Sequence, residues 1–189
     1  MRILAFAGST RRESYNKKLV RIAAQGARDA GAEVTEIDLR DLPMPLYDAD
    51  AEAEGGLPVH ARTFKQLLLA HEGLLLSCPE YNSGPTAVLK NAIDWASRSA
   101  PGEAPLLAFQ GKVAGLLSAS PGALGGLRGL PIVRLILSNI GVLVVPEQLA
   151  LAKANEAFGP DGGLLDPKRA EAAKRVGAAV ARLVSRTHP

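Results

Sequence analysis

Hydroxyl, amide and guanidinium side chains gather in one short stretch near the start of the chain. Residues 8–16 read Gly-Ser-Thr-Arg-Arg-Glu-Ser-Tyr-Asn and lead directly into a segment with helical periodicity. These groups, together with the free N–H groups of a helix start, suit a phosphate, and Arg11 could contact it through paired hydrogen bonds. The alternative is that Ser14 only caps the helix and Arg11 is solvated. So many hydrogen-bonding groups in one turn favour phosphate binding.

Two later stretches could hold the rest of a ligand. Residues 79–84, Pro-Glu-Tyr-Asn-Ser-Gly, have a restricted backbone whose N–H and C=O groups could contact the edge of a flat heterocycle, with Tyr81 near its face. An ordinary tight turn with a half-buried Tyr81 explains this stretch equally well. Residues 118–126 are rich in glycine, which permits either close backbone approach to a ligand or a flexible turn before a helix.

The absence of known nucleotide-binding and phosphatase motifs restricts the ligands and reactions that these stretches could serve. No Gly-x-Gly-x-x-Gly follows the first apolar segment, and no Gly-x-x-x-x-Gly-Lys-Ser/Thr occurs anywhere, which favours a mononucleotide phosphate over a pyrophosphate or a triphosphate. Cys78 precedes a proline, and Gly84 stands where a phosphatase motif has arginine, so we expect Cys78 to be a buried apolar residue. His60, His71 and His188 are scattered along the chain and predict no metal site.

The spacing of apolar residues predicts the elements that position these stretches. Five short apolar segments are typical of strands: residues 2–7, 33–38, 73–78, 112–118 and 142–145. They alternate with five segments of helical spacing: residues 16–30, 58–70, 85–96, 127–140 and 166–186. This alternation predicts a single domain, residues 1–189, in which helices cover both faces of a doubly wound parallel sheet. A ligand binds such a sheet beyond the carboxyl ends of its strands, where the strand order reverses, so the three stretches should meet there.

Composition excludes several other classes of protein. Hydrophobic residues make up 47% and charged residues 22% of the chain, which is ordinary for a globular protein and excludes intrinsic disorder. A single cysteine excludes internal disulfides and cysteine clusters. The net charge of +3 accompanies only 4% aromatic residues, which argues against nucleic-acid binding. No stretch approaches the ~18 apolar residues of a membrane span, and none resembles a targeting signal, which predicts a cytoplasmic protein without membrane contact.

Three loops and one helical segment together resemble the NADPH-dependent FMN reductases, a flavodoxin-like family that includes chromate and quinone reductases and some azoreductases. Residues 8–19 are similar to its phosphate loop (Gly-Ser-x-Arg-x-x-Ser-x-Asn-x-x-Leu). Residues 79–82 (Pro-Glu-Tyr-Asn) resemble its flavin-ring loop, residues 89–95 (Leu-Lys-Asn-Ala-Ile-Asp-Trp) the helix that follows, and residues 118–128 its third loop. The resemblance covers residues 2–147, and the sequence beyond them carries no motif of the family.

The resemblance implies a five-stranded flavodoxin-like sheet of strand order 2-1-3-4-5, with FMN bound where that order reverses. The residues implied to hold the FMN phosphate are Ser9, Arg11, Ser14, Tyr15 and Asn16. Those implied to line the isoalloxazine ring, mostly through their backbone, are Pro79, Glu80, Tyr81, Asn82 and Ser83. Ser120 and Gly122 are implied to approach the far side of the ring.

The implied function is oxidoreduction: hydride passes from NADPH or NADH through bound FMN to a quinone, flavin, azo compound or similar small acceptor, with ping-pong kinetics. No side chain is needed as a general base, so we expect no catalytic side chain, and the scattered histidines give no reason to expect a metal ion. Two alternatives bind FMN without NAD(P)H turnover. One is a flavodoxin-type electron carrier, which a sequence pI near 9.2 opposes, and the other is a non-enzymatic FMN-binding module.

The resemblance also implies a homodimer or a homotetramer. Trp95 and the segments 89–95 and 127–140 are the interface candidates, unless their apolar faces pack only on the sheet. The stretch 41–56 is expected to be a loop. Its acidic residues are expected to be solvated, with a position bordering the acceptor pocket as the alternative: Asp48, Asp50, Glu52 and Glu54.

Overall fold

The computed structural model describes residues 1–188, and five parallel strands form its main sheet in the order β2-β1-β3-β6-β7. Counted along the chain, this is the predicted order 2-1-3-4-5. The strand order reverses between β1 and β3, which is where such a sheet binds ligands. The strands are β1 (Arg2–Ala7), β2 (Glu33–Glu36), β3 (Gly73–Ser77), β6 (Val113–Ala119) and β7 (Leu143–Leu151).

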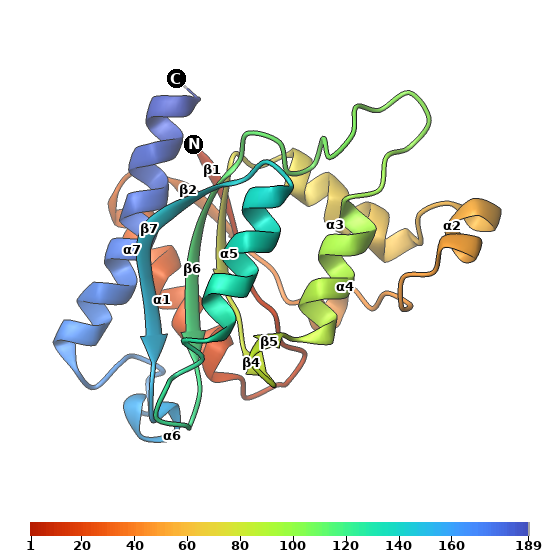
Figure 1. Ribbon diagram of the computed structural model, residues 1–189. Coiled ribbons are helices and arrows are strands. Elements are labelled where there is room, and N and C mark those ends of the chain that lie inside the picture. The colour runs from red at the N-terminus through yellow and green to blue at the C-terminus, as the bar shows by residue number, and fades with distance from the viewer. Residues whose placement is uncertain (189) are drawn as a thin grey trace.

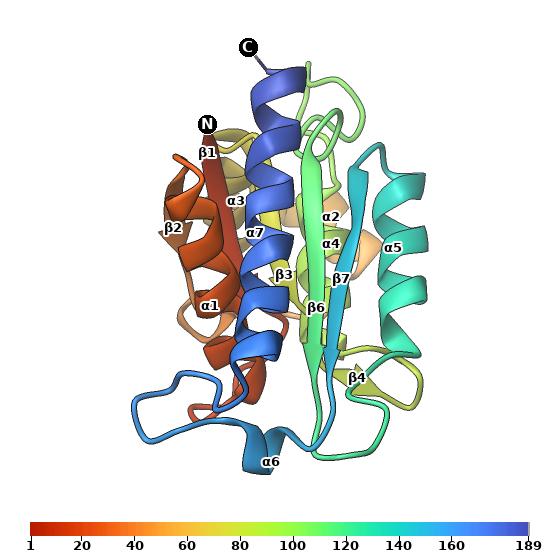
Figure 2. The ribbon, with the colours of Figure 1, turned by 90° about the vertical axis from the view of Figure 1, so that its left-hand side faces the viewer.

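Helices cover both faces of the sheet (Figures 1 and 2). One face packs against α1 (Tyr15–Asp29) and α7 (Pro167–Thr187). The other packs against α3 (Val59–Leu69), α4 (Ala87–Ala96) and α5 (Gly129–Asn139). Shorter helical segments complete the chain: η1 (Leu39–Asp41), α2 (Ala49–Gly55) and α6 (Ala154–Ala157).

Apolar side chains on both faces of each central strand explain this layering. In β1, Ile3 and Ala5 belong to the core under α1 and α7, whereas Leu4 and Phe6 belong to the core under α3, α4 and α5. Alternate residues of a strand point to opposite faces, so a nearly continuous apolar run requires helices on both sides.

Glycines allow α1 and α7 to cross closely. A Cβ atom added at Gly26 would lie 2.1 Å from the carbonyl oxygen of Lys174, and one at Gly177 would lie 1.8 Å from that of Ala23. The two helix backbones therefore touch at this crossing. Such contact fixes the position of α1, whose first turn contains the last residues of the stretch predicted to bind phosphate.

Several predicted boundaries are corrected. The stretch 41–56 contains α2, which forms because Asp48 accepts hydrogen bonds from the N–H groups of Asp50 and Ala51 at its start. The segment predicted as a helix from residue 85 begins instead at Ala87, after its N-cap Thr86. The last strand continues to Leu151 rather than ending at residue 145, because the ladder shifts register around Pro146 and then resumes at this edge of the sheet.

Cys78 is buried as predicted, and burial raises the pKa of its thiol to about 12. His71 is an ordinary core histidine, since its ring nitrogens lie 2.6 Å from the carbonyl oxygen of Leu67 and 2.8 Å from the hydroxyl of Thr35. Among residues 1–188, no helix has both the length and the apolar character needed to cross a bilayer.

Candidate functional site

Three loops meet at the carboxyl ends of β1, β3 and β6 (Figure 1). The N–H group of Gly8 donates to the carbonyl of Ser77 at 2.9 Å, and that of Cys78 donates to the carbonyl of Leu117 at 2.7 Å. The hydroxyl of Thr86 donates to the carbonyl of Gly8 at 2.7 Å. The three stretches predicted to bind one ligand are therefore neighbours in space, although they come from distant parts of the sequence.

Asn16 connects these loops through its side chain. Its Oδ1 accepts hydrogen bonds from the Ser77 hydroxyl at 2.8 Å and the Ala119 N–H at 3.0 Å, while its Nδ2 donates to the Ala119 carbonyl at 2.8 Å. The residue is only 4% exposed. Because Oδ1 accepts two hydrogen bonds and Nδ2 donates one within the protein, the side chain serves the fold, and the backbone N–H of Asn16 is left for a ligand.

The start of α1 offers several unpaired donors. Ser14 is its N-cap, but its hydroxyl forms no capping hydrogen bond, and the N–H groups of Tyr15 and Asn16 have no acceptor within residues 1–188. The Ser9 hydroxyl oxygen accepts from the N–H of Arg11 at 3.3 Å, which leaves the Ser9 proton available. The Arg11 side chain is exposed beside them. Hydroxyls, a guanidinium and helix-start amides together form a cradle for an anion.

The second loop is a tight hairpin rather than an irregular turn. Its strands β4 (Glu80–Tyr81) and β5 (Gly84–Pro85) pair in antiparallel fashion around Asn82 and Ser83. Both turn residues have left-handed backbones, with φ of 52° and 68°. Two positive φ angles are the signature of a type I′ turn. The Tyr81 side chain is 58% exposed, and the hairpin therefore presents backbone and an aromatic face to solvent.

Glu80 attaches this hairpin to the third loop. Its carboxylate accepts hydrogen bonds from Arg128 Nε at 2.9 Å and from the N–H of Gly129, the first residue of α5, at 3.0 Å. Burial tends to raise the pKa of Glu80, but these hydrogen bonds outweigh it and hold that pKa below its ordinary value. The Glu80 side chain thus caps α5, and its backbone is what remains for a ligand.

The third loop lies directly over the end of β6. Gly125 and Gly126 have positive φ angles of 62° and 88°, and a Cβ atom added at Gly126 would lie 1.8 Å from Ser118 Oγ. Ser118 Oγ is buried and has no hydrogen-bond partner within residues 1–188. The Ser120 hydroxyl oxygen accepts from the Gly122 N–H at 3.2 Å, which shapes the exposed tip of this loop. The glycines thus permit the loop backbone to lie close against the end of β6, and its approach to a ligand stays a prediction.

These observations fit FMN. An exposed guanidinium with free hydroxyls and amides suits a phosphate, and the neighbouring hairpin and glycine-rich loop suit a flat ring approached by backbone. The side chains of Asn16 and Glu80 hold the three loops together, and their assignment to the cofactor stays a prediction that concerns their backbone groups.

In the segment 89–95, the polar side chains Asn91 and Trp95 hold α4 against the segment 45–47. In α4, Asn91 accepts from the Tyr47 N–H and donates to the Pro45 carbonyl, both at 2.8 Å, and Trp95 Nε1 donates to the same carbonyl at 2.8 Å. Trp95 is 1% exposed, and its ring meets that of Tyr47 edge to face. The prediction of Trp95 as an interface residue is therefore wrong, because its ring packs inside the chain.

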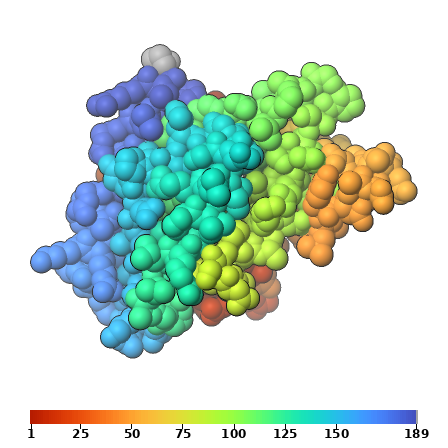
Figure 3. Space-filling model, viewed as in Figure 1, coloured from red at the N-terminus to blue at the C-terminus, as the bar shows by residue number. Residues whose placement is uncertain are grey.

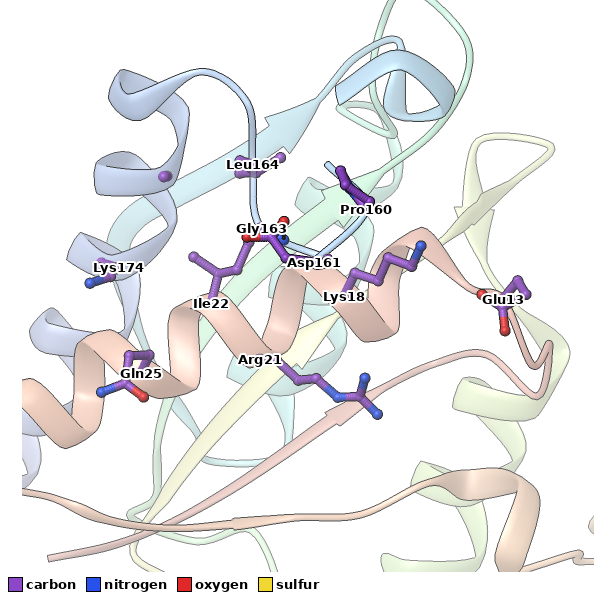
Figure 4. A pocket seen from close by; sticks show the side chains of 12 residues that line it. Glu13, Lys18, Arg21, Ile22, Gln25, Pro160, Asp161, Gly163, Leu164 and Lys174 are labelled. Atoms are coloured by element: carbon purple, nitrogen blue, oxygen red, sulfur yellow. Dashed lines mark hydrogen bonds between the residues drawn. The ribbon is translucent and has the colours of Figure 1, made fainter. Parts of the chain in front are cut away.

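Two cavities include residues of the first loop. One of about 350 Å³ lies between η1, the segment 42–44 and α4, and Thr10 of the first loop lines it. A second, of about 680 Å³, runs along α1 beneath the loop 160–164 (Figure 4). The second cavity includes Glu13 but no residue of the hairpin or of the glycine-rich loop, so it is separate from the place where the three loops meet.

Sequence reasoning gave no individual role to four residues at the site, although it included Ser118 and Arg128 in the third loop: Ser77, Ser118, Arg128 and Phe158. Ser77 was assigned only to a strand, and nothing near it in the sequence indicates its hydrogen bond to Asn16. Phe158 stacks on Tyr15, with ring centroids 6.0 Å apart and planes 6° apart. The scarcity of aromatic residues was the only signal that could have drawn attention to Phe158.

Comparison with known proteins decides the family. The profile of NADPH-dependent FMN reductases matches residues 1–156. The chain belongs to this family. An NAD(P)H-dependent FMN reductase of Pseudomonas aeruginosa is 38% identical over 174 residues, which span 90% of this chain and 88% of that protein. An NADPH:quinone oxidoreductase of Arabidopsis thaliana is 32% identical over 185 residues, which span 93% and 88% of the two chains.

Solved structures agree with this membership at the level of the fold. FerB, a flavoenzyme NAD(P)H:(acceptor) oxidoreductase from Paracoccus denitrificans, has a TM-score of 0.82 at 24% identity, with 98% of each chain covered. A flavodoxin from the domain Archaea has a TM-score of 0.63 at 12% identity, with 98% of this chain and 99% of that chain covered. The predicted family and flavodoxin-like fold are therefore confirmed. The match to the FMN reductase family includes all three loops and ends two residues before Phe158.

Proposed function

We propose that this protein is a single-domain, cytoplasmic NAD(P)H-dependent FMN oxidoreductase whose acceptors are quinone-type small molecules. The observation that carries the proposal is the meeting of three loops at the strand-order reversal, with unpaired donors at the start of α1, in a chain of the FMN reductase family. The names of its relatives include FMN reductase and quinone reductase.

The residues of this chain serve to bind and orient FMN. In the proposal, Arg11, the hydroxyls of Ser9 and Ser14 and the N–H groups of Tyr15 and Asn16 hold the phosphate. The backbone of residues 79–83 lines the ring, and Ser120 and Gly122 lie on its far side. Bound FMN supplies the hydride chemistry, with NADPH or NADH as donor. Cys78 is too well buried and too weakly acidic, with a pKa raised to about 12, to act as a nucleophile.

An anaerobic spectrum tests the activity. The protein is mixed with FMN, freed of excess flavin, and titrated with NADPH under nitrogen while the flavin absorbance is followed. We expect flavin to be retained and then bleached within seconds, and a quinone added afterwards to restore the absorbance. Retained flavin that NADPH does not bleach would favour an electron carrier or a binding module. Failure to retain flavin would contradict the assignment of the three loops.

A matched pair of arginine variants tests the phosphate site. Arg11→Ala should weaken FMN binding by about tenfold to a hundredfold, since a hydrogen bond to a charged group contributes roughly 1.5–3 kcal/mol. Riboflavin, which lacks the phosphate, should lose little affinity. Arg12 is also exposed and next in sequence, so Arg12→Ala is the control and should bind FMN almost normally. Equal losses for FMN and riboflavin in Arg11→Ala would contradict this role.

For the oligomer, we propose that a second copy of the chain packs on α5, as a homodimer or within a homotetramer. The helix lies on the face seen in Figure 3. Exposed apolar side chains occur on α5 and in the segments directly before and after it, with exposed fractions of 42% to 67%: Leu124, Leu127, Ile132, Leu135 and Leu143. A cluster of this kind is typical of an interaction surface. Sedimentation of the wild type should show a species larger than the 19.8 kDa chain, and Leu135→Lys should shift it toward the monomer. A wild type that sediments only as a monomer would contradict the proposal.

A further inference from the structure

The segment 152–166, here called the return segment, connects β7 to α7 and passes the candidate site. The N–H group of Ala154, which begins α6, donates to the carbonyl of Ser120 at 3.0 Å, and that of Lys153 donates to the carbonyl of Gly122 at 3.3 Å. These bonds join the start of this segment to the third loop. Further on, an isolated antiparallel bridge pairs Phe158 with Leu164 and closes the turn between them.

The far end of this segment contacts the first loop through aromatic rings. Phe158 lies parallel to Tyr15, with ring centroids 6.0 Å apart and planes 6° apart. The Arg11 guanidinium carbon lies 5.9 Å from the centroid of the Tyr15 ring, and Lys18 Nζ lies 5.9 Å from that of Phe158. Two cations and two rings thus form one continuous stack, and Tyr15 joins Arg11 to Phe158.

Phe158 is held firmly enough to orient the Tyr15 ring. It packs, together with Tyr15 and Leu164, against the core under α1 and α7. The loop 160–164 of the return segment lies over α1, and Figure 4 shows Pro160 and Leu164 above the stretch of α1 that carries Lys18 and Ile22. The Phe158 ring is therefore fixed by a closed turn, whereas Arg11 is an exposed side chain that forms no ion pair with a carboxylate of residues 1–188.

We infer that Phe158 is a positioning residue for the FMN phosphate: it holds the Tyr15 ring, and through that ring it orients the Arg11 guanidinium. This inference rests on the proposed function. A long, flexible arginine binds an anion more tightly when its orientation is fixed in advance, because less side-chain entropy is lost on binding. The return segment thus becomes a determinant of the preference for FMN over riboflavin, although Phe158 lies outside the family match.

Binding of FMN and riboflavin to four proteins tests the inference. Phe158→Leu keeps an apolar side chain but removes the ring, and it should raise the FMN dissociation constant about fivefold to tenfold with little change for riboflavin. Phe158→Tyr keeps the ring and should retain the wild-type ratio of the two constants. Leu165→Ala alters a largely exposed residue of the same segment and should behave as wild type. Tyr15→Leu, which removes the other ring of the stack, should reproduce the loss if Phe158→Leu does not fold.

A double-mutant cycle then asks whether Phe158 acts through Arg11. In the Arg11→Ala background, Phe158→Leu should have almost no further effect on FMN binding. Fully additive losses would overturn the inference, and so would an equal loss of FMN and riboflavin in Phe158→Leu. If the wild type itself fails to prefer FMN over riboflavin, the proposed phosphate site is wrong. If it prefers FMN and Phe158→Leu retains that preference, only this inference is wrong.

Discussion

The first loop and the β4–β5 hairpin lie side by side at the carboxyl edge of the sheet, but they are attached in different ways. The first loop is held by the neutral, buried amide of Asn16, which has three hydrogen-bond partners on Ser77 and Ala119. The hairpin is held by the charged carboxylate of Glu80, whose partner Arg128 has a side chain that is 60% exposed.

In both loops, the side chain that anchors the loop is distinct from the groups that remain for a ligand, but the two anchors differ in chemistry. The Asn16 anchor is dry and pH-independent, and it leaves the hydroxyls and amides at the start of α1 free for a phosphate. The hairpin depends on an ionised group, and it also contains two left-handed residues, Asn82 and Ser83. The phosphate side of the site should therefore be rigid, while the ring side should respond to pH and to relief of backbone strain.

Removing the Asn16 amide should have the largest effect. Asn16→Ala leaves the Ser77 hydroxyl and both backbone groups of Ala119 buried without partners, so we expect a loss of about 3 kcal/mol in the free energy of unfolding. Urea denaturation measures this loss. Asn139→Ala, at an exposed position at the end of α5, is the control and should change stability by less than about 0.5 kcal/mol. A stable Asn16→Ala variant that binds FMN poorly would show that the amide serves the ligand instead.

Much of the fold was accessible from the sequence, because strands such as β1 and β3 are short apolar runs and α1 has a clear apolar side. The same local patterns gave wrong element boundaries where a residue type is compatible with more than one kind of structure. Pro146 interrupted the apolar pattern of the last strand, yet β7 accommodates it at a register shift on the sheet edge. The acidic stretch of α2 was mistaken for a loop because it has no buried side.

The sequence indicated which loops form the site, but not which of their side chains point into the protein. Asn16 was assigned to the phosphate and Glu80, mostly through its backbone, to the ring, but the sequence did not indicate that both side chains anchor loops of the protein. Their partners are distant in sequence: 103 residues separate Asn16 from Ala119, and 48 separate Glu80 from Arg128. Local patterns of one sequence carry no information on such pairs, since only the folded sheet brings them together. Phe158 escaped notice for the same reason.

Neutralising Glu80 should have an intermediate effect. Glu80→Gln keeps an acceptor for the Gly129 N–H but removes the negative charge at the start of α5, so we expect a loss of about 1 kcal/mol in unfolding free energy at pH 7. Glu147→Gln, at an exposed position of β7, is the control and should lose almost nothing.

The pH dependence sharpens this test. Because the pKa of Glu80 in the folded protein is lowered from its ordinary value of 4.5, its stabilising contribution is complete above about pH 4.5 and is lost as the pH falls through the lowered folded-state pKa. The stability difference between wild type and Glu80→Gln should therefore be constant from pH 6 to pH 8 and shrink below pH 4. A difference that persists unchanged at pH 3 would show that the charge is not what holds the hairpin.

Relief of strain in the hairpin should have the smallest effect, and in the opposite direction. A left-handed backbone costs a residue with a side chain roughly 1–2 kcal/mol, whereas asparagine tolerates it better and glycine adopts it freely. Ser83→Gly should therefore stabilise the protein by about 0.5 kcal/mol, after the greater chain entropy of glycine is subtracted, and Asn82→Gly should gain less. If Ser83→Gly also binds FMN as wild type does, the backbone alone contacts the ring at this position. A loss of FMN affinity in the more stable variant would instead show that the Ser83 hydroxyl contacts the flavin, and that the strain at this turn is retained for binding.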